Sequence, residues 1–204
     1  MYELIKKIWQ IMGRINDRIF RGGADFSSWM SREEIGISDS EGSQYQPSSD
    51  LLFFVLKRLK PGNKDCIIDI GCGKGRAMWI MSKFDFKKIS GYDISKELVV
   101  IANENFKKLN LHNCVAVDGD ASTYSLYDEY NYFYISNPVP ETLFRKMLNL
   151  IYESLERRPR RAIMIYMNPV CNEVIMNDGK FMLSFSQKHF IKWYRFNVYV
   201  YGGD

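Results

Sequence analysis

The stretch "CIIDIGCGKGRAMWI", residues 66–80, decides the fold class of this 204-residue chain. A short apolar run ends at residue 70, three glycines follow at alternate positions, and an apolar helical pattern begins directly after them. A strand, a glycine loop and a helix in that order are typical of nucleotide-binding α/β proteins. Gly71, Gly73 and Gly75 nevertheless have the spacing G-x-G-x-G, whereas the dinucleotide-binding loop of dehydrogenases has G-x-G-x-x-G.

The rest of the chain alternates between short apolar runs and helical patterns. We expect strands at residues 66–70, 87–93, 113–117, 132–136, 162–167, 181–186 and 196–201. We expect helices at residues 51–60, 77–82, 96–109, 141–155 and 172–176. This alternation predicts a doubly wound α/β fold, in which helices cover both faces of a mostly parallel seven-stranded sheet. The last two strands are too close in sequence for a crossover helix, so the C-terminal strand should be antiparallel.

Two units are expected along the chain. Residues 61–204 should form the ligand-binding domain, and residues 1–60 an N-terminal helical or lid segment packed on it. Apolar residues from Leu4 to Ile19 recur on one face of a helix. Charges every few residues exclude a signal peptide or a membrane span there. The helix could pack on its own domain, lie on a membrane surface, or form a dimer contact.

Composition and charge favour an ordinary globular protein. The net charge is +4, and the four cysteines include no C-x-x-C pair. With only two histidines, no zinc site of familiar spacing can form, so no metal is expected. Unpaired cysteines fit a reduced, cytoplasmic compartment. The basic run at residues 157–161 precedes a strand, and Glu153 and Glu156 lie at helix ion-pair spacing to it, so a nucleic-acid partner is the less favoured interpretation.

The strand ends predict the site, because ligands of such sheets bind at the carboxyl ends of the strands. Gly71 and Gly73 allow backbone to approach a ligand, and Gly75 allows close packing where a helix starts. Asp93 ends the second strand, where a carboxylate can accept both hydroxyls of a ribose. Asp120 lies in the turn "DGDAS" after the third strand, where it can accept from the exocyclic amine of adenine. The ligand is therefore expected to contain adenosine.

Asp69 narrows the choice of ligand. An acid beside the glycine loop suits a ligand with a positive amino group and would repel a pyrophosphate. With the strand-two acid and "GDA", the run D-x-G-x-G-x-G resembles the class I S-adenosylmethionine-dependent methyltransferases over residues 65–204. The resemblance implies S-adenosyl-L-methionine as cofactor and methyl transfer as the activity. The alternatives are a catalytically silent S-adenosylmethionine-binding partner subunit and, disfavoured by Asp69, an NAD-dependent dehydrogenase.

The resemblance also implies which residues hold the cofactor. Asp69, Gly71 and Gly73 would contact its methionine part, and Asp93 its ribose. Ile94 would pack on adenine, while Asp120 and Ala121 would read its edge. The full set implied is Asp69, Gly71, Cys72, Gly73, Gly75, Asp93, Ile94, Asp120, Ala121 and Asn137.

Two Asn-Pro turns follow the fourth and fifth strands, at residues 137–139 and 168–170. Asn137 occupies the place where amino-methylating relatives carry Asn-Pro-Pro-aromatic, so the resemblance makes it a candidate catalytic residue. Val139 and Pro140 depart from that pattern, which weakens the case for an amine acceptor. The alternative is that the prolines end strands and Asn137 satisfies backbone groups.

Tyr45 is the second candidate catalytic residue. The segment "YQPSS", residues 45–49, resembles a turn of seven-strand protein-lysine methyltransferases that lies near cofactor and substrate. An N-capped turn before a helix explains the same residues equally well. The acceptor is thus expected to be a small molecule or a protein side chain, lysine included.

Overall fold

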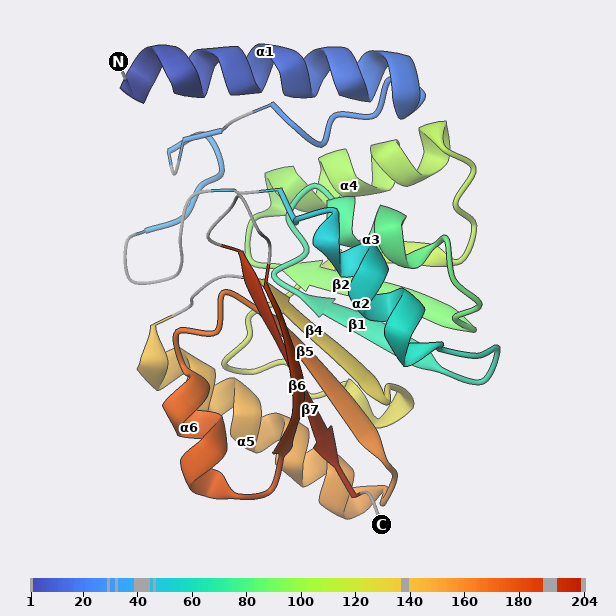
Figure 1. Ribbon diagram of the computed structural model, residues 1–204, viewed down its shortest axis with the longest axis vertical. Helices are drawn as coiled ribbons and strands as arrows, with labels where there is room; N and C mark the ends of the chain where they lie inside the picture. Colours follow the sequence, from blue (N-terminus) through green and yellow to red (C-terminus); the bar gives the residue numbers. More distant parts are fainter. Residues whose placement is uncertain are drawn as a thin grey trace.

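A computed structural model describes residues 2–28, 30–31, 33–38, 45, 47–136, 140–188 and 194–202, with side chains from residue 11 onward. These residues contain a seven-stranded sheet with the order β3-β2-β1-β4-β5-β7-β6 (Figure 1). The strands are β1 (Cys66–Ile70), β2 (Lys88–Asp93), β3 (Cys114–Asp118), β4 (Tyr132–Ser136), β5 (Ala162–Met167), β6 (Met182–Lys188) and β7 (Arg195–Tyr201). The helices are α1 (Tyr2–Phe20), α2 (Leu51–Leu59), α3 (Arg76–Met81), α4 (Lys96–Lys108), α5 (Glu141–Arg157) and α6 (Asn172–Asp178), with a 3₁₀ turn η1 (Tyr127–Glu129).

The pairing of the strands confirms the predicted topology. β1 pairs in parallel with β2 and β4, β2 with β3, and β4 with β5. β7 is antiparallel to both of its neighbours, β5 and β6, as its short connection from β6 requires. The strand order reverses between β1 and β4, and ligands of such sheets bind at this switch point.

Apolar side chains cover both faces of the sheet because successive strand residues point to opposite sides. Ile67 packs with buried residues of α2, α3 and α4 on one face. Its neighbour Ile68 packs with Phe133 and with buried residues of α5 and α6 on the other. Two apolar cores therefore hold the sheet and its helices together.

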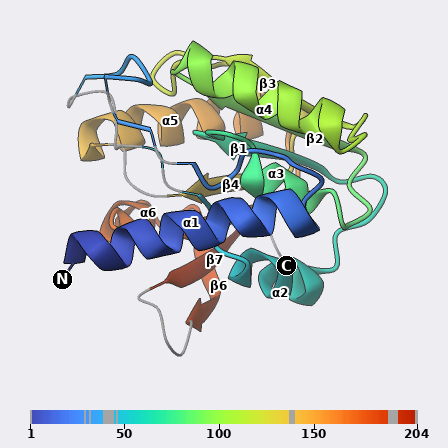
Figure 2. The ribbon, with the colours of Figure 1, turned by 90° about the horizontal axis from the view of Figure 1, so that it is seen from above.

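The helix α1 lies at one end of the long axis of the molecule, as the outermost element (Figures 1 and 2). Asp17 accepts a hydrogen bond of 3.0 Å from the backbone N–H of Phe26. A Cβ on Gly13 would lie only 2.6 Å from that of Ser27, so the helix and the chain after it are in close contact there. The apolar residues of its second half are exposed instead. The expectation that α1 packs on its domain through an apolar stripe differs from the structure at these residues, because the contact is made by its polar side.

The basic run at the end of α5 is used within the fold. Arg157 pairs with Asp128 of η1 at 2.9 Å, whereas Glu156 pairs with Lys180 at 3.0 Å. Arg160 donates to the backbone carbonyls of Tyr127, Tyr130 and Ser154. These ion pairs differ from the predicted pairs with Glu153 and Glu156, because η1 brings Asp128 and its own carbonyls to the helix end.

Candidate functional site

The glycine loop after β1 turns back over the end of β2. The backbone N–H groups of Gly71 and Cys72 both donate to the carbonyl of Tyr92 at 2.9 Å. Gly71, Gly73 and Gly75 have φ values of +77°, +52° and +80°, a conformation that favours glycine. A Cβ on Gly71 would meet no described atom within 4 Å, so the loop is open on this side.

Two aromatic side chains press on the other glycines of the loop. A Cβ on Gly73 would lie 2.6 Å from the ring of Tyr45, and one on Gly75 would lie 2.5 Å from the ring of Phe106 in α4. Gly75 is also the N-cap residue of α3, in agreement with the close packing predicted at that position. Aromatic rings thus cover the loop at Gly73 and Gly75, and the loop is open at Gly71.

Asp69 lies within β1, next to the loop, with 1% of its surface exposed. Neither of its carboxylate oxygens has a hydrogen-bond partner among the described residues. Burial raises the pKa of Asp69 well above its usual value, and the nearby charge of Asp93 raises it further. A buried carboxylate without a partner is costly, and a cationic group at this position would supply the missing interaction.

Asp93 connects the glycine loop to β2. One of its carboxylate oxygens accepts from the backbone N–H of Gly73 at 2.8 Å, and the other from that of Ser95 at 3.0 Å. Burial raises the pKa of Asp93, and these backbone donors oppose that shift. Each carboxylate oxygen can accept a second hydrogen bond, so Asp93 keeps capacity for two hydroxyls of a ligand. Beside it, Ile94 exposes an apolar side chain at the edge of the loop.

The turn after β3 lies against the same strand end. The N–H of Gly119 donates to the carbonyl of Asp93 at 3.0 Å, which brings the two turns together. Asp120 is half-buried, and one carboxylate oxygen accepts from the N–H of Ser122 at 2.7 Å. Ala121 packs on the apolar core beneath it. Asp69, the glycine loop, Asp93 and this turn therefore lie along one edge of the sheet, as their positions in the sequence predicted.

The side chain of Cys72 points into the protein. A Cβ on Gly91 of β2 would lie 2.6 Å from the Cβ of Cys72, so the thiol fills the space beneath the loop. Burial raises the pKa of Cys72 well above its usual value and keeps the thiol neutral. Only the backbone of Cys72 follows the open surface of the loop.

The structure brings Tyr45 to the loop, with its hydroxyl engaged. The buried side chain packs on Gly73, and its hydroxyl donates to the carbonyl of Phe26 at 2.7 Å. Burial raises the pKa of Tyr45 well above its usual value, which disfavours a role as a base. Asn137, the other candidate catalytic residue, lies outside the described residues.

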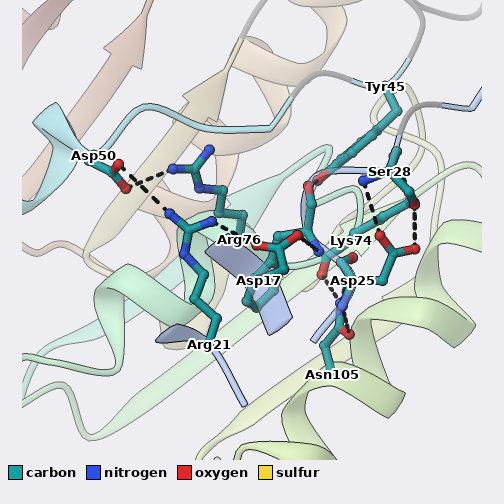
Figure 3. A network of polar contacts seen from close by, with 10 residues as sticks. Asp17, Arg21, Asp25, Ser28, Tyr45, Asp50, Lys74, Arg76 and Asn105 are labelled. Carbon is teal, nitrogen blue, oxygen red and sulfur yellow. Dashed lines mark hydrogen bonds and ion pairs between the residues drawn. The ribbon is translucent and has the colours of Figure 1, made fainter. Parts of the chain in front are cut away.

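Lys74 ties the glycine loop to the N-terminal segment (Figure 3). Its fully buried ammonium lies 2.8 Å from Asp25 and donates to the carbonyl of Ser28 at 2.9 Å and to the hydroxyl of that residue. Asn105 of α4 accepts from the N–H of Asp25 at 2.7 Å and donates to the carbonyls of Asp25 and Lys74 at 3.0 Å each. Neither role was predicted from the sequence, because a lysine between glycines usually has an exposed side chain and an asparagine within a helix gives no signal of a distant partner.

A second set of ion pairs lies where α1 meets the start of α2 and α3 (Figure 3). Arg21 pairs with Asp17 at 2.7 Å and approaches Asp50 to 3.9 Å. Asp50 also pairs with Arg76, the first residue of α3, at 2.8 Å. The N-terminal segment is thus joined by charged groups to Lys74 of the glycine loop and to Arg76 directly after the loop.

The two strands that precede the Asn-Pro turns, β4 and β5, are neighbours in the sheet. The hydroxyls of Tyr134 and Ser48 are buried and 2.7 Å apart. The backbone N–H of Asn168 donates to the carbonyl of Arg195 at 2.7 Å, and its side-chain oxygen accepts from the N–H of that residue at 3.3 Å. Asn168 therefore extends the pairing with β7.

The chain matches the model of a known protein family. The methyltransferase-domain family matches residues 62–188, which include the glycine loop, the ends of β2 and β3, and the sheet as far as β6. An uncharacterized protein of Methanocaldococcus jannaschii is 36% identical over 64 residues, which is 31% of this chain and 28% of that protein.

Solved structures resemble the fold at low sequence identity. A SAM-dependent methyltransferase from Aquifex aeolicus is 16% identical, with a TM-score of 0.57 over 73% of this chain and 88% of its own. An RNA methyltransferase from Salinibacter ruber, solved in complex with S-adenosyl-L-homocysteine, is 14% identical, with a TM-score of 0.57 over 76% of this chain and 92% of its own. The M1A22 tRNA methyltransferase of Bacillus subtilis is 16% identical, with a TM-score of 0.60 over 78% of this chain and 68% of its own.

Proposed function

Because the chain belongs to the class I S-adenosylmethionine-dependent methyltransferases, we propose that it transfers a methyl group to a small molecule or a protein side chain, lysine included. The observation that carries the proposal is the buried carboxylate of Asp69, which has no described partner and lies beside an open glycine loop. An ammonium group is the natural partner of such a carboxylate, and S-adenosylmethionine carries one on its methionine part.

The other candidate residues at this end of the sheet also fit S-adenosylmethionine. Asp93 has acceptor capacity left for the two ribose hydroxyls. The exposed side chain of Ile94 offers an apolar surface for adenine, and the turn at Asp120 and Ala121 lies next to it along the sheet edge. The pyrophosphate of NAD would instead meet the negative charges of Asp69 and Asp93, which argues against a dehydrogenase.

The reaction needs little proton transfer from the protein. S-adenosylmethionine supplies a methyl group that is already activated by the positive charge on its sulfur. The contribution of this chain would therefore be alignment, with Asp69 holding the methionine part of the donor and Asp93 its ribose. We assign Tyr45 a positioning role, because its ring packs on Gly73 while its hydroxyl is engaged with Phe26.

The first experiment measures which cofactor stabilises the protein. S-adenosylhomocysteine should raise the melting temperature and NAD should not, because a ligand that binds only the folded state stabilises it. Asp69→Asn should weaken S-adenosylhomocysteine binding about 10- to 100-fold in calorimetry, since a charged hydrogen bond contributes about 1.5–3 kcal/mol. Asp178→Asn, at an exposed acid ending α6, is the matched control. A shift with NAD alone would overturn the proposal.

We propose that Asn137 contacts the methyl acceptor, because it directly follows β4. Asn137→Ala should leave cofactor affinity nearly unchanged while lowering turnover, measured as S-adenosylhomocysteine release with candidate amines and lysine peptides. Unchanged turnover would make Asn137 a turn residue only. Lost cofactor binding would place it on the donor side. The two RNA methyltransferases share only the fold with this chain at 14% and 16% identity, so their acceptors are not assigned to it.

A further inference from the structure

In the second half of α1, large apolar side chains are exposed and an acidic side chain is buried. Ile11, Met12, Ile15 and Ile19, which we call the α1 stripe, are 57%, 57%, 52% and 64% exposed. Their spacing places them on one face of the helix. Asp17, on the opposite side, is buried and paired with Arg21 at 2.7 Å. The described fold thus buries the acid of this half-helix and leaves its large apolar side chains uncovered.

The charges beside the α1 stripe are all positive. Arg14 and Arg18 are exposed and lie within three or four positions of Ile11 and Ile15, so they flank the stripe. Asp17 is the only acid between residues 11 and 20, and its charge faces away from the stripe, paired with Arg21. A partner for this surface must therefore be apolar at its centre and negatively charged around it.

We propose that α1 docks, lying flat, on the surface of an anionic lipid bilayer. The α1 stripe would enter the boundary between headgroups and acyl chains, while Arg14 and Arg18 would contact lipid phosphates. The described helices include none long and apolar enough to cross a membrane, so α1 would lie on the bilayer. A second copy of the chain fits less well, because a symmetric dimer would join two surfaces carrying the same arginines and no acid. α1 lies at one end of the molecule (Figures 1 and 2), and the exposure of the α1 stripe shows that this face is accessible.

Flotation with lipid vesicles tests this proposal independently of methyl transfer. The full chain should float with vesicles of phosphatidylcholine containing phosphatidylglycerol, and much less with phosphatidylcholine alone. The double variant Ile15→Asp/Ile19→Asp should lower the partition coefficient about 100-fold or more, since each isoleucine loses its transfer out of water. Arg14→Glu/Arg18→Glu should lower it about 10-fold or more and remove most of its dependence on anionic lipid and on salt.

Val100→Asp is the matched control, because Val100 is also an exposed β-branched residue on a helix, at 58% exposure on α4. It should float like the wild type, and all variants should keep the wild-type melting temperature and S-adenosylhomocysteine affinity. Wild-type protein that stays unbound with anionic vesicles would overturn the proposal. So would a dimer in light scattering that is lost in Ile15→Asp/Ile19→Asp, since the stripe would then be a contact between copies.

Discussion

Different interactions stabilise the sheet domain and dock the N-terminal segment, residues 2–50, on it. The sheet buries apolar side chains on both faces. The described part of the N-terminal segment contributes a small apolar cluster around Ile35 and Tyr45 and the buried ring of Phe26, and it also docks through an ion pair and hydrogen bonds that meet at Lys74. Apolar burial is non-directional, whereas a buried charged group requires its partner in place. Docking of the N-terminal segment should therefore be more sensitive to single polar changes than the sheet is.

The largest effect is expected from a change inside the sheet. Phe133 in β4 is fully buried between the sheet and α5, so Phe133→Ala should lower the free energy of unfolding by about 3–5 kcal/mol. Urea denaturation followed by circular dichroism measures this loss. Phe54→Ala, at a residue that is 60% exposed, should change it by no more than about 0.5 kcal/mol. Similar losses in the two variants would mean that the sheet is not the main source of stability.

A smaller and more local effect is expected at Lys74. Lys74→Met leaves Asp25 and Ser28 without their buried cation, which should cost about 2–4 kcal/mol, less than a fully buried pair because Asp25 is partly exposed. Limited proteolysis should show faster cleavage within residues 21–50 while the sheet stays folded. Lys180→Met breaks an exposed ion pair with Glu156 and should cost less than about 1 kcal/mol. Equal protease resistance in both variants would remove the distinction between the two regions.

The smallest effect concerns the pH dependence of stability, because the ionised carboxylate of Asp69 destabilises the folded state when no cofactor is bound. The pKa of Asp69 is raised by burial, so the folded state binds this proton more tightly than the unfolded state does. Its contribution to stability therefore falls as the pH rises from about 4, the ordinary pKa of an aspartate, through the raised pKa. Without cofactor, Asp69→Asn should be more stable than the wild type at about pH 8 and closer to it at about pH 4.5. S-adenosylhomocysteine should reverse the order at the higher pH. Thermal unfolding at both pH values gives the comparison, and a less stable variant in the absence of ligand would contradict it.

The sheet could be predicted almost entirely from the sequence. Runs such as residues 66–70 and 162–167 are short, apolar and bounded by polar or glycine positions, and parallel strands buried on both faces require that pattern. The candidate cofactor-binding residues came from the same pattern, because Asp69 and Asp93 lie at or next to the end of a predicted strand and Asp120 lies in the turn after one. Local patterning therefore determined both the elements and the side of the sheet on which they meet.

The N-terminal segment could not be predicted in the same way. Asp25 meets Asn105 across 80 positions of the chain, and no local periodicity marks such a pair. Lys74 has the sequence context of an exposed loop residue, and its burial depends on a segment that precedes it by 46 to 49 positions. The α1 stripe has the spacing of a buried face, yet it is exposed because Asp17 and Gly13 make the contacts of the helix.

Trp79 of α3 stands at the junction of these regions. The guanidinium of Arg21 lies 5.3 Å from the centre of its ring, and the ring of Phe26 lies 5.8 Å away. Both neighbours belong to the N-terminal segment, so the indole loses them whenever that segment separates from the sheet. With Trp9, Trp29 and Trp193 replaced by phenylalanine, the emission of Trp79 becomes an intrinsic fluorescence signal for the separation. Measuring this emission with and without S-adenosylhomocysteine would then show whether cofactor binding changes how firmly the segment is docked.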